Sequence, residues 1–328
     1  MANYDLFNGD ADGICALIQL RLAEPRKATL VTGIKRDNAL LKHISPKAGD
    51  NITVLDVSMK KNTAPLQAAL AAGAKVFYVD HHQAGEIPQH ENLQAHINTA
   101  ANTCTSLIVN AYLKGQFEGW VIVAAFGDNI TVVAEKLCEK AGYSAQQVDH
   151  LRTLGVCMNY NGYGASLDDL FYHPADLYRI ASQYESPFNF IKNEADVFSK
   201  LKNGYEQDMA KALAIKPIHE REGAKGMAAA IFILPNEKWA RRISGVLGNE
   251  LANRFPNRAH AILTERAEKN DGALAYQVSI RAPKINAEGA DDVATKFGGG
   301  GRKGAAGIDV LLKSDVDSFY SCFELQYT

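Results

Sequence analysis

Acidic and histidine side chains suited to divalent metal ions recur at four places in the first half of the chain. They are Asp10 with Asp12, Asp56, the run Asp80-His81-His82, and Asp128. Hard ions such as Mg²⁺ and Mn²⁺ prefer carboxylate oxygens, and Mn²⁺ also accepts imidazole nitrogen. Two such ions roughly 4 Å apart can clamp a phosphoryl group and generate bound hydroxide at neutral pH. These residues therefore predict a divalent metal site that hydrolyses a phosphoester bond.

The order of these residues suggests separate roles within such a site. Asp10 and Asp12 lie in a Gly-flanked turn, so their side chains can address different ions, and Asp56 is the natural bridge between the ions. His81 supplies a nitrogen ligand, and the adjacent His82 is free to contact phosphate or transfer a proton. Each motif alone has a plainer explanation as a helix N-cap, a turn or a structural histidine. Their combination favours the metal site.

Short β-branched and aromatic runs precede the acidic residues, as expected of strands buried on both faces. Strands are predicted at residues 4–7, 28–32, 52–55, 76–79 and 121–126, and helices at 14–22 and 64–72. This βαβ rhythm indicates a parallel sheet with helices on both faces. Because open α/β sheets bind ligands at the carboxyl ends of their strands, four strand ends should bring the acidic and imidazole groups to one edge.

The second half of the chain predicts a smaller mixed α/β domain. Strands are expected at residues 227–234, 260–264, 273–280 and 308–312, helices at 244–254 and 290–297 and at the end of the chain, and a Gly-rich loop at 298–307. A polar helical segment comes before them. The predicted domains are a metal-binding catalytic domain at 1–185, a helical connector at 186–216 and a substrate-binding domain at 217–328.

Composition narrows the class of protein. The chain has 328 residues, 47% of them hydrophobic, and a net charge of -2, which excludes a globally basic protein that coats nucleic acid. The five cysteines are scattered without CxxC spacing, as in proteins of a reducing compartment. Neither a signal peptide nor an apolar run of about 20 residues is evident. We therefore expect a cytoplasmic enzyme with no membrane partner, and a homodimer is one assembly left open.

The ordered motifs resemble those of the DHH phosphoesterases. In the first half these motifs are Gly9-Asp-Ala-Asp-Gly13, Val54-Leu-Asp56, Val79-Asp-His-His82 and Gly127-Asp128. The second half is similar to the DHH-associated C-terminal domain at Ser244-Gly-Val-Leu-Gly248, Val278-Ser-Ile-Arg281 and Gly299-Gly-Gly-Arg-Lys-Gly-Ala-Ala-Gly307. The Asp-Ala-Asp-Gly motif resembles the RecJ exonucleases, and the length is closer to the nanoRNase and oligoribonuclease branch.

The resemblance implies roles for particular residues. It gives two Mn²⁺ ions, with Mg²⁺ as the alternative metal, held by Asp10, Asp12, Asp56, His81 and Asp128. Asp80 would orient a histidine of the motif, and His82 would meet the scissile phosphate. In the second domain, unobstructed glycine N–H groups and two arginines would bind substrate. These are Arg281, Gly299, Gly300, Gly301 and Arg302.

Two positions depart from the family pattern. Many members carry a histidine four residues before the first motif aspartate, where this chain has Leu6, and the amide oxygen of Asn8 is the expected substitute ligand. The glycine loop carries Arg302 where Gly-Gly-Gly-His is usual. Both changes bear on metal affinity and substrate class.

The predicted function is hydrolysis of phosphodiester bonds in short oligonucleotides, one nucleotide at a time. Alternative substrates are a cyclic dinucleotide and 3′-phosphoadenosine 5′-phosphate, since the resemblance covers these activities. A nucleotide-binding regulator with a degenerate site is a third interpretation, motivated by Leu6. Retention of the acidic and histidine set argues against a regulator, because pure binding would need few of those residues.

Overall fold

The computed structural model describes residues 1–222, 228–267 and 274–328. The chain divides into two compact units, Met1–Tyr205 and Glu206–Thr328. Met227 and Ala273, the first residues of two predicted strands, lie outside the described residues. No helix in the described ranges is long and apolar enough to cross a membrane.

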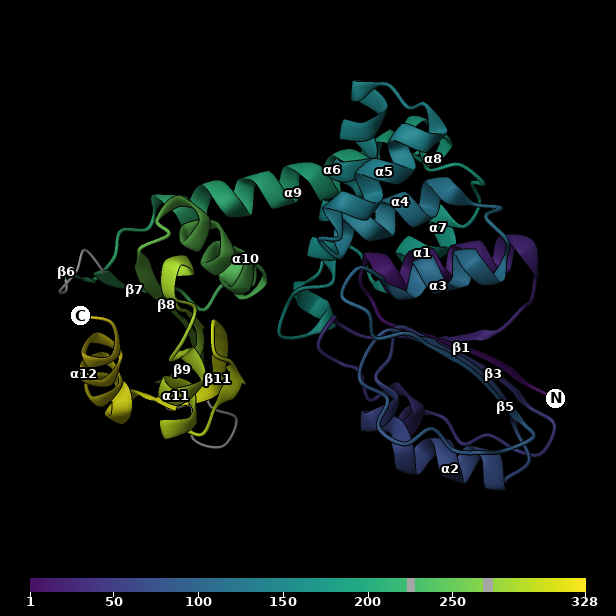
Figure 1. The fold of residues 1–328 in the computed structure, drawn as a ribbon, viewed down its shortest axis with the longest axis horizontal. Helices are drawn as coiled ribbons and strands as arrows, with labels where there is room; N and C mark the ends of the chain where they lie inside the picture. The colour runs from purple at the N-terminus through teal and green to yellow at the C-terminus, as the bar shows by residue number, and fades with distance from the viewer. Residues whose placement is uncertain (223–227, 268–273) are drawn as a thin grey trace. The chain divides into compact units, whose positions relative to one another are not determined.

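The first unit is built on a five-stranded parallel sheet (Figure 1). Its strands, in spatial order, are β2 (Thr29–Val31), β1 (Asn3–Phe7), β3 (Asn51–Leu55), β4 (Lys75–Asp80) and β5 (Leu93–Ile97). The four strands predicted between residues 4 and 79 are confirmed. The edge strand β5 was not predicted, because it is half exposed and carries polar residues between its apolar ones.

Alternate residues of the central strands enter two separate cores, which explains their continuous apolar runs. Phe7, Leu55 and Val79 pack against helices α1 (Ala11–Ala23) and α3 (Thr105–Tyr112). Leu6 and its neighbours on the other face pack with helix α2 (Thr63–Ala71). Figure 1 shows α2 on one side of the sheet and α1 and α3 on the other. The predicted layers, a parallel sheet with helices on both faces, are confirmed.

Residues 121–126 form helix, so the strand predicted there is wrong. They belong to α4 (Glu118–Gly127), which contacts α1, α3, α5 (Thr131–Ala141) and α6 (Ala145–Asn161). Because α4 is covered on nearly all sides, its apolar run lacks the helical spacing that would have identified it. Asp128 therefore caps the end of a helix, where a strand end was predicted.

Further helices follow in the first unit and lead out of it. They are α7 (Pro174–Ala181), α8 (Pro187–Asn193) and α9 (Ala195–Ala214), and α7 and α8 each begin with a proline in the first turn, which preorganises the backbone for a helix. Helix α9 begins in the first unit and ends in the second. The residues predicted as a connector, 186–216, thus contain α8 and α9.

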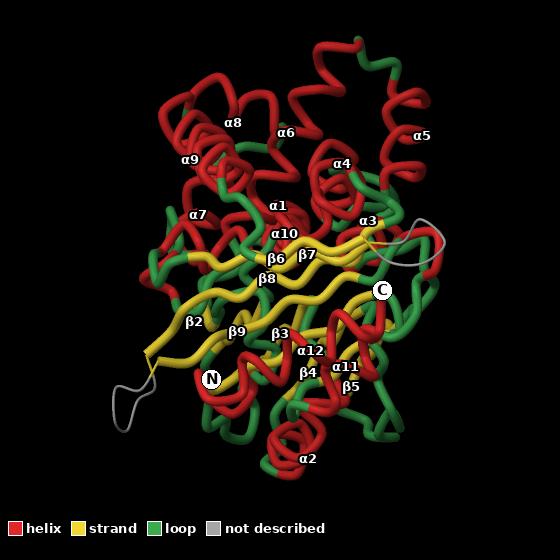
Figure 2. Tube along the Cα trace, turned by 90° about the vertical axis from the view of Figure 1, so that its left-hand side faces the viewer, coloured by secondary structure: helices red, strands yellow, loops and turns green. Residues whose placement is uncertain are grey.

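The second unit contains a six-stranded mixed sheet, whose strands β6 to β9 run side by side in Figure 2. Its strands, in spatial order, are β10 (Gly300–Arg302), β11 (Ala305–Leu312), β9 (Leu274–Arg281), β8 (Arg258–Ala267), β7 (Ala228–Leu234) and β6 (His219–Glu222). Helix α10 (Lys238–Arg254) covers one face, and α11 (Ala290–Lys296) and α12 (Val316–Tyr327) lie with the core of the other. The predicted mixed α/β fold is confirmed.

The segment predicted as a Gly-rich loop at 298–307 contains strand β10 and the start of β11, which pair as an antiparallel hairpin. A Cβ atom on Gly299 would lie 2.2 Å from the carbonyl oxygen of Gly307. Gly301 has a φ of 154°, and a Cβ atom on it would lie 2.5 Å from Ala306 Cα. The close approach of the two strands therefore requires glycine at both positions.

Buried His260 on β8 gives a prediction for stability against pH. Its side chain is fully buried, and Arg258 Nε donates to His260 Nε2 at 3.0 Å, which places the proton on Nδ1. Burial and the charge of Arg258 lower the pKa of His260 to about 3, from an ordinary value of 6.5. Between these values the unfolded chain binds a proton that the folded chain does not. Stability should therefore fall with falling pH by about 1.4 kcal/mol per unit below pH 6.5.

Urea unfolding of the full chain at pH 7 and pH 5 measures this loss. The variant His260→Gln keeps an acceptor for Arg258 but cannot take up a proton, so its stability should change less between the two values. An equal change in both proteins would show that His260 does not titrate as its burial requires.

Candidate metal centre

Asp56 follows strand β3 in a backbone conformation that few residues tolerate. Its φ is 58°, in the left-handed region, while its backbone N–H still donates to the carbonyl of Val79 at 3.1 Å. Thr105 Oγ1 donates to Asp56 Oδ1 at 3.2 Å. Left-handed backbone at a non-glycine residue costs free energy and tends to occur at functional sites. The turn after β3 therefore holds this carboxylate in a fixed, strained position.

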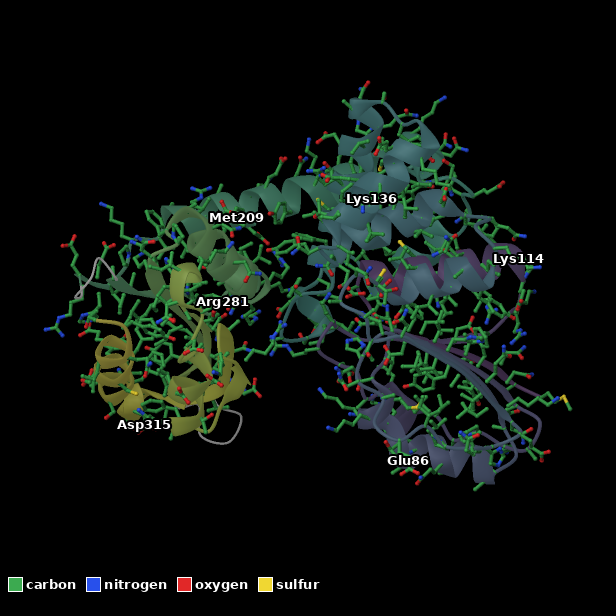
Figure 3. All side chains as sticks on the ribbon, in the orientation of Figure 1. Glu86, Lys114, Lys136, Met209, Arg281 and Asp315 are labelled. Atoms are coloured by element: carbon green, nitrogen blue, oxygen red, sulfur yellow. The ribbon has the colours of Figure 1, made fainter. Side chains whose placement is uncertain are left out.

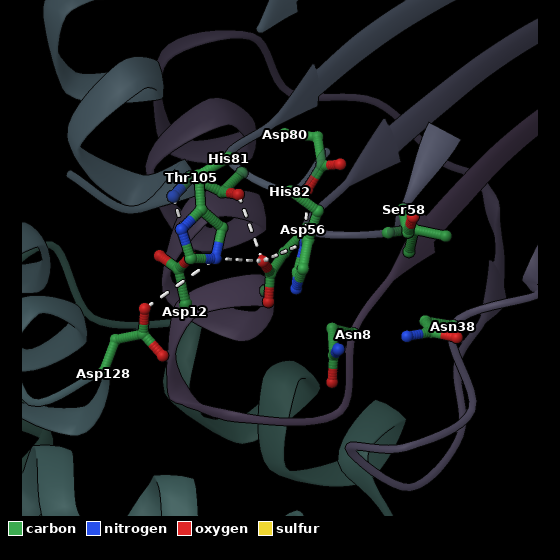
Figure 4. Close-up of polar contacts among 12 residues, drawn as sticks. Asn8, Asp12, Asn38, Asp56, Ser58, Asp80, His81, His82, Thr105 and Asp128 are labelled. Carbon is green, nitrogen blue, oxygen red and sulfur yellow. Dashed lines mark hydrogen bonds and ion pairs between the residues drawn. The ribbon is translucent and has the colours of Figure 1, made fainter. Parts of the chain in front are cut away.

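His81 lies at the centre of three carboxylates (Figure 4). Its Nε2 is 3.3 Å from Asp56 Oδ1, 3.8 Å from Asp128 Oδ2 and 4.0 Å from Asp12 Oδ2. Donor atoms about 2.1 Å from an octahedral ion lie about 3 to 4 Å from one another. Two sets of three residues have the spacing of a divalent metal site, Asp12 with His81 and Asp128, and Asp56 with His81 and His82. Both offer the oxygen and nitrogen donors that Mn²⁺ accepts.

Asp12 is fixed by the helix it faces. Thr105 N donates to Asp12 Oδ2 and Ser106 N to Asp12 Oδ1, both at 2.7 Å. These are free N–H groups at the start of α3, whose own N-cap residue Cys104 provides no side-chain cap. A carboxylate at a helix N-terminus is favoured by the helix dipole. These two hydrogen bonds thus hold the Asp12 carboxylate in one orientation beside His81.

Asp80 and His82 form a pair beside the cluster. His82 Nδ1 lies 2.7 Å from Asp80 Oδ1, and Asp80 is fully buried while 37% of the His82 side chain is exposed. The hydrogen bond with Asp80 outweighs partial burial and raises the pKa of His82. With Nδ1 held, the histidine presents Nε2 for other contacts. The pairing of Asp80 with a motif histidine is the one expected from the sequence.

Replacing Asp80 by asparagine should reduce kcat by about 10-fold to 100-fold, the usual cost of losing a carboxylate that orients a histidine. The amide keeps the side-chain shape but loses the charge that favours protonated His82. Steady-state kinetics with Mn²⁺ titration tests this, since KM and Mn²⁺ affinity should change little. A matched rise in KM with unchanged kcat would contradict the positioning role.

The cluster carries more negative charge than its surroundings neutralise. Burial, together with repulsion from Asp12 and Asp10, raises the pKa of Asp56 well above its ordinary value. Burial and the charge of Asp12 likewise raise the pKa of Asp128. A divalent cation would relieve both penalties, because it favours the ionised form of each ligand. The raised pKa values of Asp56 and Asp128 and the spacing of the donor atoms therefore both favour a bound divalent ion.

Asp10 lies on the other side of the cluster, in contact with Lys35. Its Oδ1 accepts from the N–H groups of Asp12 and Gly13, as an N-cap of α1, and Lys35 Nζ lies 2.5 Å from its Oδ2. Burial disfavours the ionised carboxylate, yet the charge of Lys35 and these hydrogen bonds hold the pKa of Asp10 below its ordinary value. Lys35 was not predicted as a site residue, since no motif surrounds it.

Leu6 and Asn8 lie at the end of β1, before the first motif aspartate. Asn8 Nδ2 donates to the carbonyl of Lys35 at 3.2 Å, and Asn8 Oδ1 is buried without a hydrogen-bond partner. Its role as a substitute metal ligand stays a prediction. Leu6 is fully buried in the core on the α2 side of the sheet. No imidazole comes from position 6.

The substrate-binding residues predicted in the second unit lie on β9 and β10. Arg281, labelled in Figure 3, donates to Asn249 Oδ1 at 2.7 Å and to the carbonyl of Gly245 at 3.2 Å, both on α10. Arg302 is exposed on β10 with Gly300 and Gly301, and Gly299 precedes them. Arg281 is thus held against α10, while Arg302 points its charge to solvent.

Comparison with known proteins agrees with this site. Residues 4–132 match the DHH family, N-terminal domain. No curated protein matches the chain. The matched residues include the motif carboxylates and histidines that gather at the carboxyl end of the parallel sheet.

Solved structures show the same two-domain fold at low identity. Exonuclease RecJ bound to manganese is 13% identical, with a TM-score of 0.61 over 99% of this chain and 89% of that one. RecJ in complex with Mn²⁺ from Thermus thermophilus is 14% identical, with a TM-score of 0.61, over 99% of this chain but 51% of that chain. The pGpG-specific phosphodiesterase PggH from Vibrio cholerae is 15% identical, with a TM-score of 0.57, over 99% and 98% of the two chains. The fold is therefore RecJ-like.

Proposed function

We propose that this chain is a Mn²⁺-dependent phosphodiesterase that hydrolyses short oligonucleotides. The observation that carries the proposal is the cluster of Asp12, Asp56 and Asp128 around His81 Nε2, at 3.3 to 4.0 Å. Oxygen and nitrogen donors at this spacing, with unrelieved negative charge, are those of a divalent metal centre. Two RecJ neighbours were solved with manganese, which supports that ion.

The residues around the cluster would act on the phosphate in different ways. A bound Mn²⁺ would supply positive charge and lower the pKa of water for attack on phosphorus. His82, held by Asp80 through Nδ1, would use Nε2 to donate a proton or hydrogen bond to a phosphate oxygen. Lys35 lies within 3.6 Å of Asp128 and would add charge complementary to phosphate.

A structural neighbour supports a short substrate. This chain has the fold of PggH, whose name gives pGpG as its substrate, over 99% of its length. The net charge of -2 argues against a globally basic protein that coats nucleic acid. We propose that Gly299, Gly300, Gly301 and the exposed Arg302 bind a terminal nucleotide, with Arg281 on β9, held against α10, supporting the same region. The free cysteines support a cytoplasmic location.

A substrate panel tests the proposal. Purified protein with Mn²⁺ should release mononucleotides from dinucleotides and short RNA or DNA oligomers, and turnover should fall as length increases. Preferential cleavage of a cyclic dinucleotide or of 3′-phosphoadenosine 5′-phosphate would replace the substrate class but keep the hydrolase. Tight nucleotide binding without turnover of any substrate would instead favour a regulator.

A further inference from the structure

Lys35 places an ammonium group inside the acidic cluster, opposite His81. Its Nζ is 2.5 Å from Asp10 Oδ2, 2.8 Å from Asn159 Oδ1 and 3.6 Å from Asp128 Oδ1. The ring of Tyr163 lies 5.8 Å from the same nitrogen. Oxygen atoms thus surround the ammonium group much as they would surround a metal ion, and 28% of the side chain is exposed.

The backbone of Lys35 is anchored on both sides. Its N–H donates to the carbonyl of Gly162 at 2.7 Å, and its carbonyl accepts from Asn8 Nδ2 at 3.2 Å. The chain leading to Lys35 also passes close to the first motif, because a Cβ on Gly9 would lie 2.0 Å from the carbonyl oxygen of Gly33. The ammonium group is therefore positioned by the fold, like the carboxylates it contacts.

The donors on the Asp10 side are already occupied. Asp10 Oδ1 caps α1 and Asp10 Oδ2 binds Lys35. Two sets of residues in the described ranges have the spacing of a metal site, Asp56 with His81 and His82, and Asp12 with His81 and Asp128. Both sets contain His81 and neither contains Asp10. The geometry thus offers a metal position at His81 and a lysine at Asp10.

Charge balance points the same way. The carboxylates of Asp10, Asp12, Asp56 and Asp128 sum to a formal charge of -4 when ionised, and Lys35 with one divalent ion supplies +3. A second divalent ion would raise the positive charge to +5 and would sit beside the ammonium group, where like charges repel. One ion leaves a net formal charge of -1 and two leave +1, and only the second arrangement places a metal against the ammonium group.

We infer that Lys35 serves as a permanent cation in place of one of two metals, so that the centre binds a single Mn²⁺ at His81, the residue that both candidate sets share. The sequence predicted two ions, one of them lacking an imidazole at position 6. Lys35 supplies positive charge on that side without any imidazole. The inference rests on the proposed metal-dependent function and specifies its cofactor.

Counting bound Mn²⁺ tests the inference without relying on turnover. Native mass spectrometry and equilibrium dialysis of the full chain should give one Mn²⁺, with the electron paramagnetic resonance spectrum of an isolated ion. Lys35→Met has nearly the same length but no charge, and should bind a second Mn²⁺ at Asp10 with the spectrum of an exchange-coupled pair. The matched variant Lys35→Arg retains the charge and should stay at one ion.

Two ions in the wild-type protein, or a Lys35→Met protein that remains at one, would overturn the role of Lys35. If Lys35→Met fails to fold, the number of Mn²⁺ ions bound by the wild-type and Lys35→Arg proteins still tests the inference. Failure of the proposed function looks different, because a protein that binds no Mn²⁺ and cleaves no phosphodiester would refute the metal-dependent hydrolase itself. Two bound ions with normal turnover would refute only the role of Lys35 and would leave the proposed hydrolase in place.

Discussion

Asp56→Asn is expected to abolish hydrolysis while making the metal-free protein more stable. The substitution removes the carboxylate closest to His81 Nε2, so kcat should fall on the order of 1000-fold. The same carboxylate is buried among other negative charges, which raise its pKa well above the ordinary value. Its charge therefore destabilises the metal-free fold at neutral pH. Removing it should raise the free energy of unfolding of the metal-free protein.

The direction of the pKa shift of Asp56 decides whether its charge stabilises or destabilises the metal-free protein. Because the folded pKa is raised, the metal-free wild-type protein loses stability as pH rises above 3.8 through the folded pKa. The asparagine variant should lack this loss. Asparagine also tolerates the φ of 58° at this position, so the change should add little backbone strain.

Urea unfolding in the presence of a chelator, with Mn²⁺-dependent turnover measured in parallel, separates the two effects. Asp176→Asn is a matched control, because Asp176 is exposed and pairs with Arg179 outside the site. That control should keep both activity and stability near wild type. Retained turnover in Asp56→Asn, or a loss of metal-free stability, would contradict the role assigned to Asp56.

The two adjacent histidines should lose activity for different reasons. His82→Ala should reduce kcat by about 100-fold to 10,000-fold, the range for loss of a proton-transferring group. Mn²⁺ affinity should remain close to wild type, because the set of Asp12, His81 and Asp128 is still in place. His81→Ala should instead weaken Mn²⁺ binding by at least about 100-fold, and activity should be lost with the metal.

Calorimetric Mn²⁺ titration beside steady-state kinetics distinguishes these outcomes. His90→Ala replaces an exposed histidine away from the cluster and should leave both measurements unchanged. Equal loss of Mn²⁺ affinity in both site variants would mean that His82 is also a metal ligand. His82 Nδ1 lies 3.8 Å from Asp56 Oδ1, close enough for His82 to share a metal with that carboxylate. Comparing the Mn²⁺ affinities of the two variants therefore shows which imidazole binds the metal.

Much of the first unit could be predicted because its strands have local signatures. The residues of β1, β3 and β4 are apolar on both faces, and the positions of Asp56 and Asp80 relative to those strands follow from the chain itself. In a parallel sheet such strands end at the same edge, so the chemistry could be placed before any coordinates. The prediction failed at α4, where complete burial removed the periodicity that distinguishes helix from strand.

The sequence by itself determined the types of candidate ligand, their order and the edge of the sheet at which they meet. Tertiary structure alone decided how they divide: one set is Asp56 with His81 and His82, another is Asp12 with His81 and Asp128, and Asp10 is paired with Lys35. Lys35 lies in no recognisable motif, and its ammonium group reaches Asp10 and Asn159 across sequence separations of 25 and 124 residues. Local sequence patterns report spacing along one element. They do not report contacts that form when distant loops are brought together by packing.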